Sequence, residues 1–173
     1  KVNLGAITYH FGGKEQLLAE VLAGKTGPMI ESGEKIVAGA GTPQARLRRL
    51  LEEYAMGLMH ENPGVRVLVA ESMLGGRRLP NSVAQAIEWR NQAFARIVND
   101  GIKAGVFRPC DVESAAWHFF GMLSSYILYR PKSGRVGRFG RYPKPQIQRA
   151  VDAAMDVFMN GLLADGARDG RRG

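Results

Sequence analysis

The chain has 173 residues, of which 45% are hydrophobic and 23% are charged, and this length allows one folded domain with a buried core. A single cysteine excludes a disulfide-stapled secreted scaffold and a cysteine-rich zinc module, so we expect a reducing, cytoplasmic setting. The longest mainly apolar stretch, residues 65–74, contains charged residues and is too short to cross a bilayer, so we expect no membrane partner.

The net charge of +8 is unevenly distributed along the chain. Six basic residues and no acidic residue lie between Arg130 and Lys144, in a segment rich in glycine. Such a loop can contact nucleic acid or an acidic partner, or it can be a flexible, solvated connection. We favour the second interpretation for the 130–144 loop.

The spacing of the apolar residues predicts an all-α protein, because it is helical almost throughout and no alternating strand pattern occurs. The first long helix is expected to begin at Lys14. Its pattern is interrupted by Gly24, Gly27 and Pro28, so Pro28 is expected to kink or end the helix. Two interpretations stay open: a hinge within one helix, or a loop between two helices.

The next helices are delimited by capping residues and prolines. Thr42 and Pro43 predict a helix start, with an end near Asn62. After an apolar segment at 65–74, a long helix is expected from Asn81 or Ser82 to a C-terminal glycine at Gly105.

The two last helices are predicted in the same way. Asp111 caps a helix that continues to Pro131. After the loop at 130–144, Pro143 and Pro145 open a last helix that ends near Leu163, and a disordered tail follows from residue 166.

The sequence lacks the residue patterns of common catalytic sites. His10, His60 and His118 lie far apart, without metal-ligand spacing. Gly24-Lys25-Thr26 matches only the end of a phosphate-binding loop, and Ala19 stands where the first glycine is required. We therefore expect no enzyme activity, no metal and no cofactor.

The segment at 2–18 carries the functional signal. Asn3 is a strong N-cap, so a short helix from Leu4 to Phe11 is expected. Small and aliphatic residues at a helix start allow close approach to bases, and polar side chains and a free helix N-terminus favour phosphates. The predicted DNA contacts are Asn3, Leu4, Gly5, Ala6, Thr8, Tyr9, His10 and Lys14.

The run from Ala6 to Glu15 resembles the recognition helix and following turn of the tetracycline-repressor (TetR/AcrR) family, and the resemblance is specific over residues 2–22. It implies a homodimeric repressor that a small hydrophobic effector releases from a palindromic operator DNA. The implied organisation is a partial helix-turn-helix at 1–24, an effector-binding and dimerisation domain at 25–165 and the tail at 166–173. The alternative is a helical ligand-binding or dimerisation module without DNA binding.

The chain begins inside the helix-turn-helix of that pattern. The first helix and nearly all of the second are missing, so the packing partners of Ile7 and Phe11 are absent. We expect that a further N-terminal segment precedes Lys1 in the native protein; the other interpretation is a form that cannot repress.

Candidate effector contacts are flexible apolar side chains and polar residues within apolar stretches. The predicted ligand-binding residues are Met56, Met59, Glu71, Arg90, Asn91, Phe94, Trp117, His118 and Met122. Glu71 and Arg90 have an alternative interpretation as solvated residues or as a structural ion pair, because a buried charge must be paired.

The last two long helices carry small residues that allow close helix approach, namely Gly121, Ala150, Ala153, Ala154 and Gly161. In the TetR family these two helices from each subunit form a four-helix dimer interface. The resemblance therefore implies a homodimer through these helices.

Overall fold

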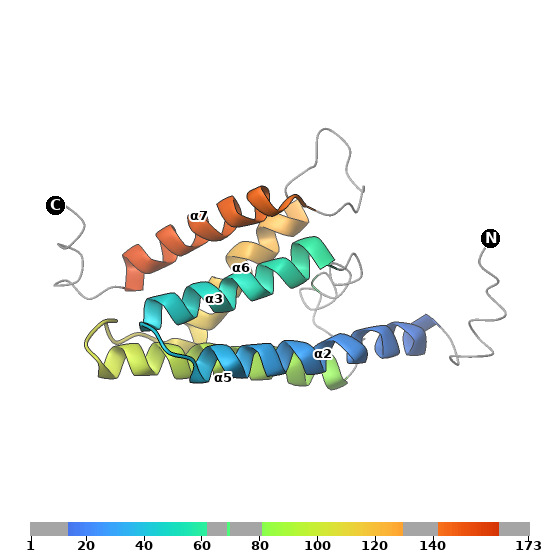
Figure 1. The fold of residues 1–173 in the computed structure, drawn as a ribbon, viewed down its shortest axis with the longest axis horizontal. Helices are drawn as coiled ribbons and strands as arrows, with labels where there is room; N and C mark the ends of the chain where they lie inside the picture. The colour runs from blue at the N-terminus through green and yellow to red at the C-terminus, as the bar shows by residue number, and fades with distance from the viewer. Residues whose placement is uncertain (1–13, 62–68, 70–80, 130–141, 163–173) are drawn as a thin grey trace.

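The computed structural model describes residues 14–61, 69, 81–129 and 142–162, and within these ranges it contains helices and no strand. The elements are α2 (Lys14–Ala38), α3 (Pro43–Met56), the π-helix η1 (Gly57–Glu61), α5 (Asn81–Lys103), α6 (Val112–Tyr129) and α7 (Lys144–Leu162). The predicted all-α fold is confirmed. Figure 1 shows α2 and α5 side by side, with α3, α6 and α7 stacked on them.

α2 is one continuous helix that includes Pro28, so the predicted loop between two helices at Gly27-Pro28 is wrong. A proline disfavours a helical conformation at the preceding residue partly through a clash with its Cβ. Gly27 has no Cβ, and the surroundings of that position are open. α2 packs along α5, with Gly33, after the proline, lying against Trp89. The first turns of α2 extend past the end of α5 (Figure 1).

α3 begins as the sequence predicts. The backbone N–H of Ala45 donates to the Thr42 side-chain oxygen over 3.2 Å, and Pro43 occupies the first turn, where its missing N–H costs no hydrogen bond. The helix buries Leu47, Leu50, Leu51 and Ala55. The helix expected to continue to Asn62 changes into the π-helix η1 at Gly57, and its described part ends at Glu61.

α5 ends at a glycine turn, as predicted. Gly105 has a positive φ of 69°, which an L side chain adopts only with strain. The turn brings the Phe107 ring back over Gly101, where a Cβ would lie 2.1 Å from Phe107 Cδ2. Phe107 is 2% exposed, so this turn joins the core.

α6 and α7 complete the bundle. Asp111 caps α6, because its side chain accepts from the Ser114 N–H at 3.2 Å and from the Ser114 hydroxyl at 2.6 Å. Before α7, the Tyr142 N–H donates to the Met59 carbonyl over 3.0 Å and connects this segment to η1. α7 buries residues at helical spacing: Ile147, Ala150, Val151, Ala154, Met155 and Met159.

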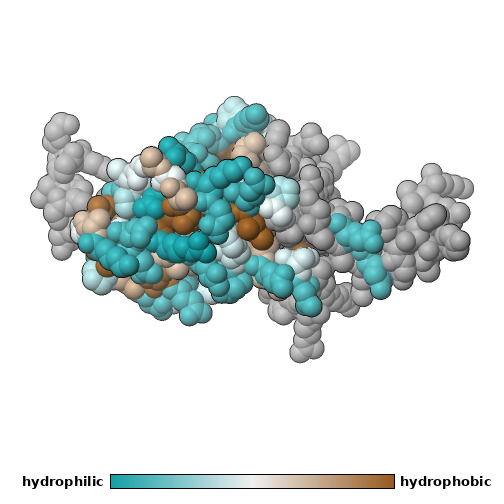
Figure 2. All heavy atoms as spheres, turned by 60° about the horizontal axis from the view of Figure 1, so that its bottom comes forward, coloured by the Kyte–Doolittle hydropathy of each residue, from teal (hydrophilic) through white to brown (hydrophobic). Residues whose placement is uncertain are grey.

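Ion pairs on the surface connect helices that are distant in sequence. Arg46 on α3 donates to the Val37 carbonyl at 3.0 Å and pairs with Asp100 on α5 at 3.1 Å. Arg48 pairs with Asp152 on α7. The face formed by α2 and α5 is mainly hydrophilic, with small separate apolar patches (Figure 2). In the described part of the chain, no helix combines the length and apolar character that a membrane span requires.

Candidate effector site and subunit interface

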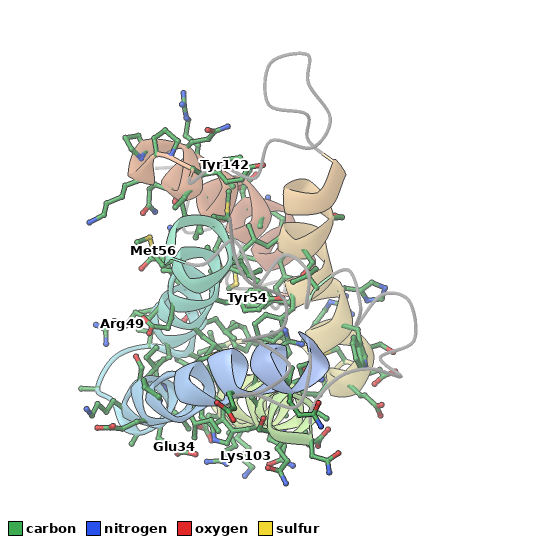
Figure 3. All side chains as sticks on the ribbon, turned by 90° about the vertical axis from the view of Figure 1, so that its right-hand side faces the viewer. Glu34, Arg49, Tyr54, Met56, Lys103 and Tyr142 are labelled. Atoms are coloured by element: carbon green, nitrogen blue, oxygen red, sulfur yellow. The ribbon has the colours of Figure 1, made fainter. Side chains whose placement is uncertain are left out.

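Aromatic rings from four helices meet in the centre of the bundle, where Phe158 of α7 lies 4.9 Å from Phe119. Phe119 and Phe120 of α6 lie 5.1 and 5.9 Å from Phe94 of α5, measured between ring centroids. Tyr54 of α3 meets Phe120 edge-on at 4.9 Å. Figure 3 shows Tyr54 pointing from α3 into the space between α3, α5 and α6. We call the group Tyr54, Phe94, Phe119 and Phe120 the aromatic cluster.

Arg90 of α5 places a cation against this cluster. Its side chain is buried, with 9% of the residue exposed. The guanidinium carbon lies 4.0 Å from the centroid of Phe120 and 4.9 Å from that of Tyr54. Burial lowers the pKa of Arg90 from its ordinary value, and Tyr54 partly offsets this effect. Each of the two rings therefore stabilises the buried cation through its π face.

The Arg90 side chain also donates two hydrogen bonds to Asn91, and the nearby Tyr54 side chain favours its charged form as well. Nε and Nη2 lie 3.3 and 3.0 Å from Oδ1 of Asn91. Among the described residues, no carboxylate forms an ion pair with Arg90. A neutral amide and two rings are thus its partners in the part of the chain that is described.

A hydrogen-bond chain fixes the tyrosine of the cluster. The Ser124 hydroxyl donates to the Phe120 carbonyl over 2.9 Å, and its oxygen lies 2.9 Å from the Tyr54 hydroxyl. Because serine has one hydroxyl proton, Tyr54 is the donor in the second bond. The Tyr54 oxygen can itself act as an acceptor, and its proximity favours the charged form of Arg90.

The structure brings together some of the predicted effector contacts and separates others. Arg90, Asn91 and Phe94 lie together on α5. Met59 is buried in η1, and Met56 is half-buried on a different side of α3 from Tyr54 (Figure 3). Glu71 lies outside the described residues.

Trp117, His118 and Met122, which were predicted as effector contacts, do not belong to the aromatic cluster. The buried face of α6 consists of Ala115, Ala116, Phe119, Phe120, Leu123 and Ser124, and Trp117 and His118 turn away from it. Trp117 is therefore 57% exposed and His118 is exposed. Met122 lies in the groove between α6 and α7.

Sequence reasoning missed Tyr54 and Ser124 as parts of this site. Tyr54 lies on the apolar stripe of α3, where its spacing indicates core packing alone. Ser124 is 70 residues away in the chain, and a serine within an apolar helix gives no signal of its partner.

Two hollows lie side by side along the groove between α6 and α7. One, of about 460 Å³, is lined by residues including Met122, Ala150, Ala153 and Ala154. The other, of about 350 Å³, is lined by residues including Cys110, His118, Met122, Val157 and Gly161. Near this groove the large apolar side chains of Trp117 and Val157 are exposed, the latter by 66%. Burial raises the pKa of the Cys110 thiol, which disfavours the reactive thiolate.

The predicted DNA contacts at 3–10 lie outside the described residues. Lys14, the last of them, is the first residue of α2, as expected. The predicted boundary at residue 24 falls within that helix. No group of three or more potential metal ligands occurs among the described His, Cys, Asp and Glu residues.

Comparison with known proteins identifies the fold. The family described as "Tetracyclin repressor-like, C-terminal domain" matches residues 40–137, more than half of the chain. The TetR family transcriptional regulator PfmR of Thermus thermophilus is 25% identical, with a TM-score of 0.67, over 90% of this chain and 80% of PfmR.

Two further solved structures share the fold at lower identity. The ketosteroid transcriptional regulator KstR2 of Mycobacterium tuberculosis is 19% identical with a TM-score of 0.69, covering 93% of this chain and 79% of KstR2. The transcriptional regulator FadR of Bacillus subtilis, solved in complex with stearoyl-CoA, is 18% identical with a TM-score of 0.62, covering 91% of this chain and 81% of FadR. No curated protein matches the chain at a significant level.

The family match covers the whole of α3, α5 and α6, which hold the aromatic cluster and Arg90. The chain therefore belongs to the TetR family of transcriptional regulators.

Proposed function

We propose that this chain is a homodimeric repressor that binds a palindromic operator and leaves it when a small effector binds beside the aromatic cluster. The observation that carries the proposal is the continuity of α2 from Lys14 to Ala38. This helix joins the segment that resembles a recognition helix to the core of the effector domain. A regulator of this kind acts in the cytoplasm and needs no catalytic group.

The contact between α2 and α5 supports a mechanical link between the two sites. Trp89 lies against Gly33 of α2, and its indole N–H donates to the Glu34 carboxylate over 2.7 Å. The next residue, Arg90, faces the aromatic cluster. An effector that shifts α5 at Arg90 thereby shifts the Trp89 contact and the direction of α2.

Such a shift requires that the effector bind the operator-bound state and the released state of the dimer with different affinities. An effector moves the population toward the released state only by the difference between its affinities for the two. A changed angle of α2 alters the separation of the two recognition helices, which must match half-sites about one helical turn or a multiple of it apart. Bending of α2 at Gly24 and Gly27 is a further prediction, since the exposed position of Gly27 leaves room for it.

The α6–α7 groove is the proposed dimer interface. It combines exposed Val157 with small residues, among them Ala153 and Gly161, that admit a second helix pair, and Trp117 is exposed on α6 as well. A two-fold axis through this groove would cover the apolar side chains of both subunits. The Arg-rich 130–144 loop has no part in the proposal.

The test is selection of binding sites from random-sequence DNA by the product of the complete reading frame that contains this chain. We expect an inverted repeat. Lys14→Ala should weaken binding to all duplexes alike and reduce the slope of log affinity against log salt by about one for each phosphate that the lysine neutralises. Changes at Leu4 or Ala6 should instead alter the preferred sequence. A dimer that selects no DNA sequence would support the ligand-binding module without DNA binding.

A further inference from the structure

Arg90 is a buried cation whose described partners are all neutral. Its residue is 9% exposed, it stacks on Phe120 at 4.0 Å, and two of its nitrogens share the single amide oxygen of Asn91. Removal of a guanidinium from water carries a large free-energy cost, which an anion at hydrogen-bond distance offsets far better than a ring or an amide. Among the described residues, no anion therefore compensates the buried charge of Arg90.

Among the described residues, one edge of the guanidinium has no hydrogen-bond acceptor of its own. Asn91 occupies the edge formed by Nε and Nη2, and Phe120 covers one face. The edge formed by Nη1 and Nη2 is the one at which a carboxylate, sulfonate or phosphate accepts two parallel hydrogen bonds. No described residue accepts a hydrogen bond from Nη1.

The residues around this edge determine which chemical groups the rest of the ligand should have. Tyr54 and Phe120 lie within 5 Å of the guanidinium, and Phe94 lies 5.9 Å from Phe120. These rings favour an apolar body, while the Tyr54 hydroxyl, which donates to Ser124, can accept one hydrogen bond from it. A fully polar anion would lose its hydration here without compensation from the rings.

We propose that the effector is an organic anion with an apolar body and that Arg90 binds its acidic group. This inference rests on the proposed function, in which an effector binds beside the aromatic cluster. The competing explanation is an internal counterion, for which Glu71, the acidic residue of the apolar 65–74 segment, is the candidate.

The test compares two probes that share a ring system and differ in charge. The anion is 1-anilinonaphthalene-8-sulfonate, and the neutral probe is N-phenyl-1-naphthylamine, which lacks the sulfonate. Fluorescence titration of the chain should show tighter binding of the anion. Arg90→Met should reduce the affinity for the anion by about tenfold or more, as expected for loss of a charged hydrogen-bonded pair, and change the affinity for the neutral probe less than about twofold.

Arg96→Gln is the matched control, because Arg96 lies on the same helix and pairs with Glu34 at the surface, and its replacement removes the same charge. It should leave both affinities unchanged. Arg90→Lys keeps the charge but loses the two-pronged edge, so it should bind the anion with intermediate affinity even if Arg90→Met folds poorly. Equal binding of the two probes to the parent, or an equal loss of both in Arg90→Met, would overturn the proposal.

Thermal unfolding distinguishes a ligand-binding role of Arg90 from an internal ion pair between Arg90 and Glu71. Without an internal counterion, Arg90→Met should leave Tm unchanged or raise it, because the variant no longer buries a charge. A similar decrease of Tm in Arg90→Met and Glu71→Gln would identify an internal pair and overturn the proposal. Selection of operator DNA is measured in a separate experiment. If the chain binds the anionic probe more tightly than the neutral one but the complete protein selects no DNA sequence, only the proposed function is contradicted.

Discussion

The indole ring of Trp89 lies directly on the backbone of Gly33. A Cβ built on Gly33 would stand 1.9 Å from Cη2 of Trp89, a distance that no pair of non-bonded carbon atoms tolerates. Glu34, the next residue, accepts a hydrogen bond from the Trp89 indole at 2.7 Å and pairs with Arg96 at 3.3 Å. Glycine at position 33 therefore sets how closely α2 approaches α5.

Gly33→Ala should destabilise the chain and push α2 away from α5. Insertion of a methyl group into a filled contact costs about 1–3 kcal/mol, which exceeds the benefit of about 1 kcal/mol from the better helix propensity of alanine. Urea unfolding measures the change. Gly27→Ala is the control on the same helix, because a Cβ at Gly27 meets no atom within 4 Å, and it should be neutral or stabilising. Equal effects of the two variants would contradict the packing argument.

Gly105→Ala should destabilise the turn after α5 through the backbone alone. Its φ is +69°, and a Cβ there has no neighbour within 4 Å, so the cost is conformational and about 1–2 kcal/mol. Gly105→Asn should cost less, since asparagine tolerates this region of φ better than alanine does. Denaturant unfolding of the two variants against the parent gives the comparison. A larger loss in the asparagine variant would show that space, not φ, limits this position.

Because Asp111 caps α6, the stability of the fold should depend on pH in the acidic range. Hydrogen bonds from the Ser114 hydroxyl and backbone lower the pKa of Asp111 below its ordinary value of 3.8. The folded state thus favours the carboxylate, so this contribution is present above pH 3.8 and is lost as the pH falls through the lowered pKa. The stability difference between the parent and Asp111→Asn, measured by denaturant unfolding from neutral to acidic pH, should shrink with acidification. A difference that grows in acid would reverse this assignment.

Val157→Glu should disrupt the dimer while leaving the subunit folded. Val157 is 66% exposed in the single chain, so a carboxylate there meets water in the monomer but is buried without a partner in the proposed interface. Light scattering at micromolar concentration should give a dimer for the parent and a mass near 18.9 kDa for the variant. Asn99→Glu, an exposed position on α5, is the matched control and should remain dimeric. A monomeric parent would remove the α6–α7 groove as an interface.

Local signals in the sequence were sufficient for the helix boundaries at most positions. Thr42 and Asp111 cap their helices with their own side chains, and Gly105 ends α5 with its own backbone conformation. Each of these signals acts within a few residues, so the sequence contains both partners side by side. The resemblance at 6–15 and the helical spacing likewise pointed to the family that residues 40–137 match.

The path of α2 could not be read in this way. Pro28 and its neighbouring glycines favour an interruption when they are considered alone. In the structure α2 is one continuous helix, and its part after Pro28 packs against α5 through Gly33 and Trp89. That contact joins residues far apart in the chain, and no local pattern reports it.

The sequence by itself determined the all-α class, the caps and the family, because periodicity, capping and motifs are encoded over short stretches of chain. Only the tertiary structure decided which polar residue among the apolar helices faces the core. Arg90 is buried against Tyr54 and Phe120, although polar residues surround it in the sequence, whereas His118 is exposed, although it stands between Trp117 and Phe119. Burial depends on which side of each helix its neighbours cover, and this follows from the packing of α3, α5 and α6 together.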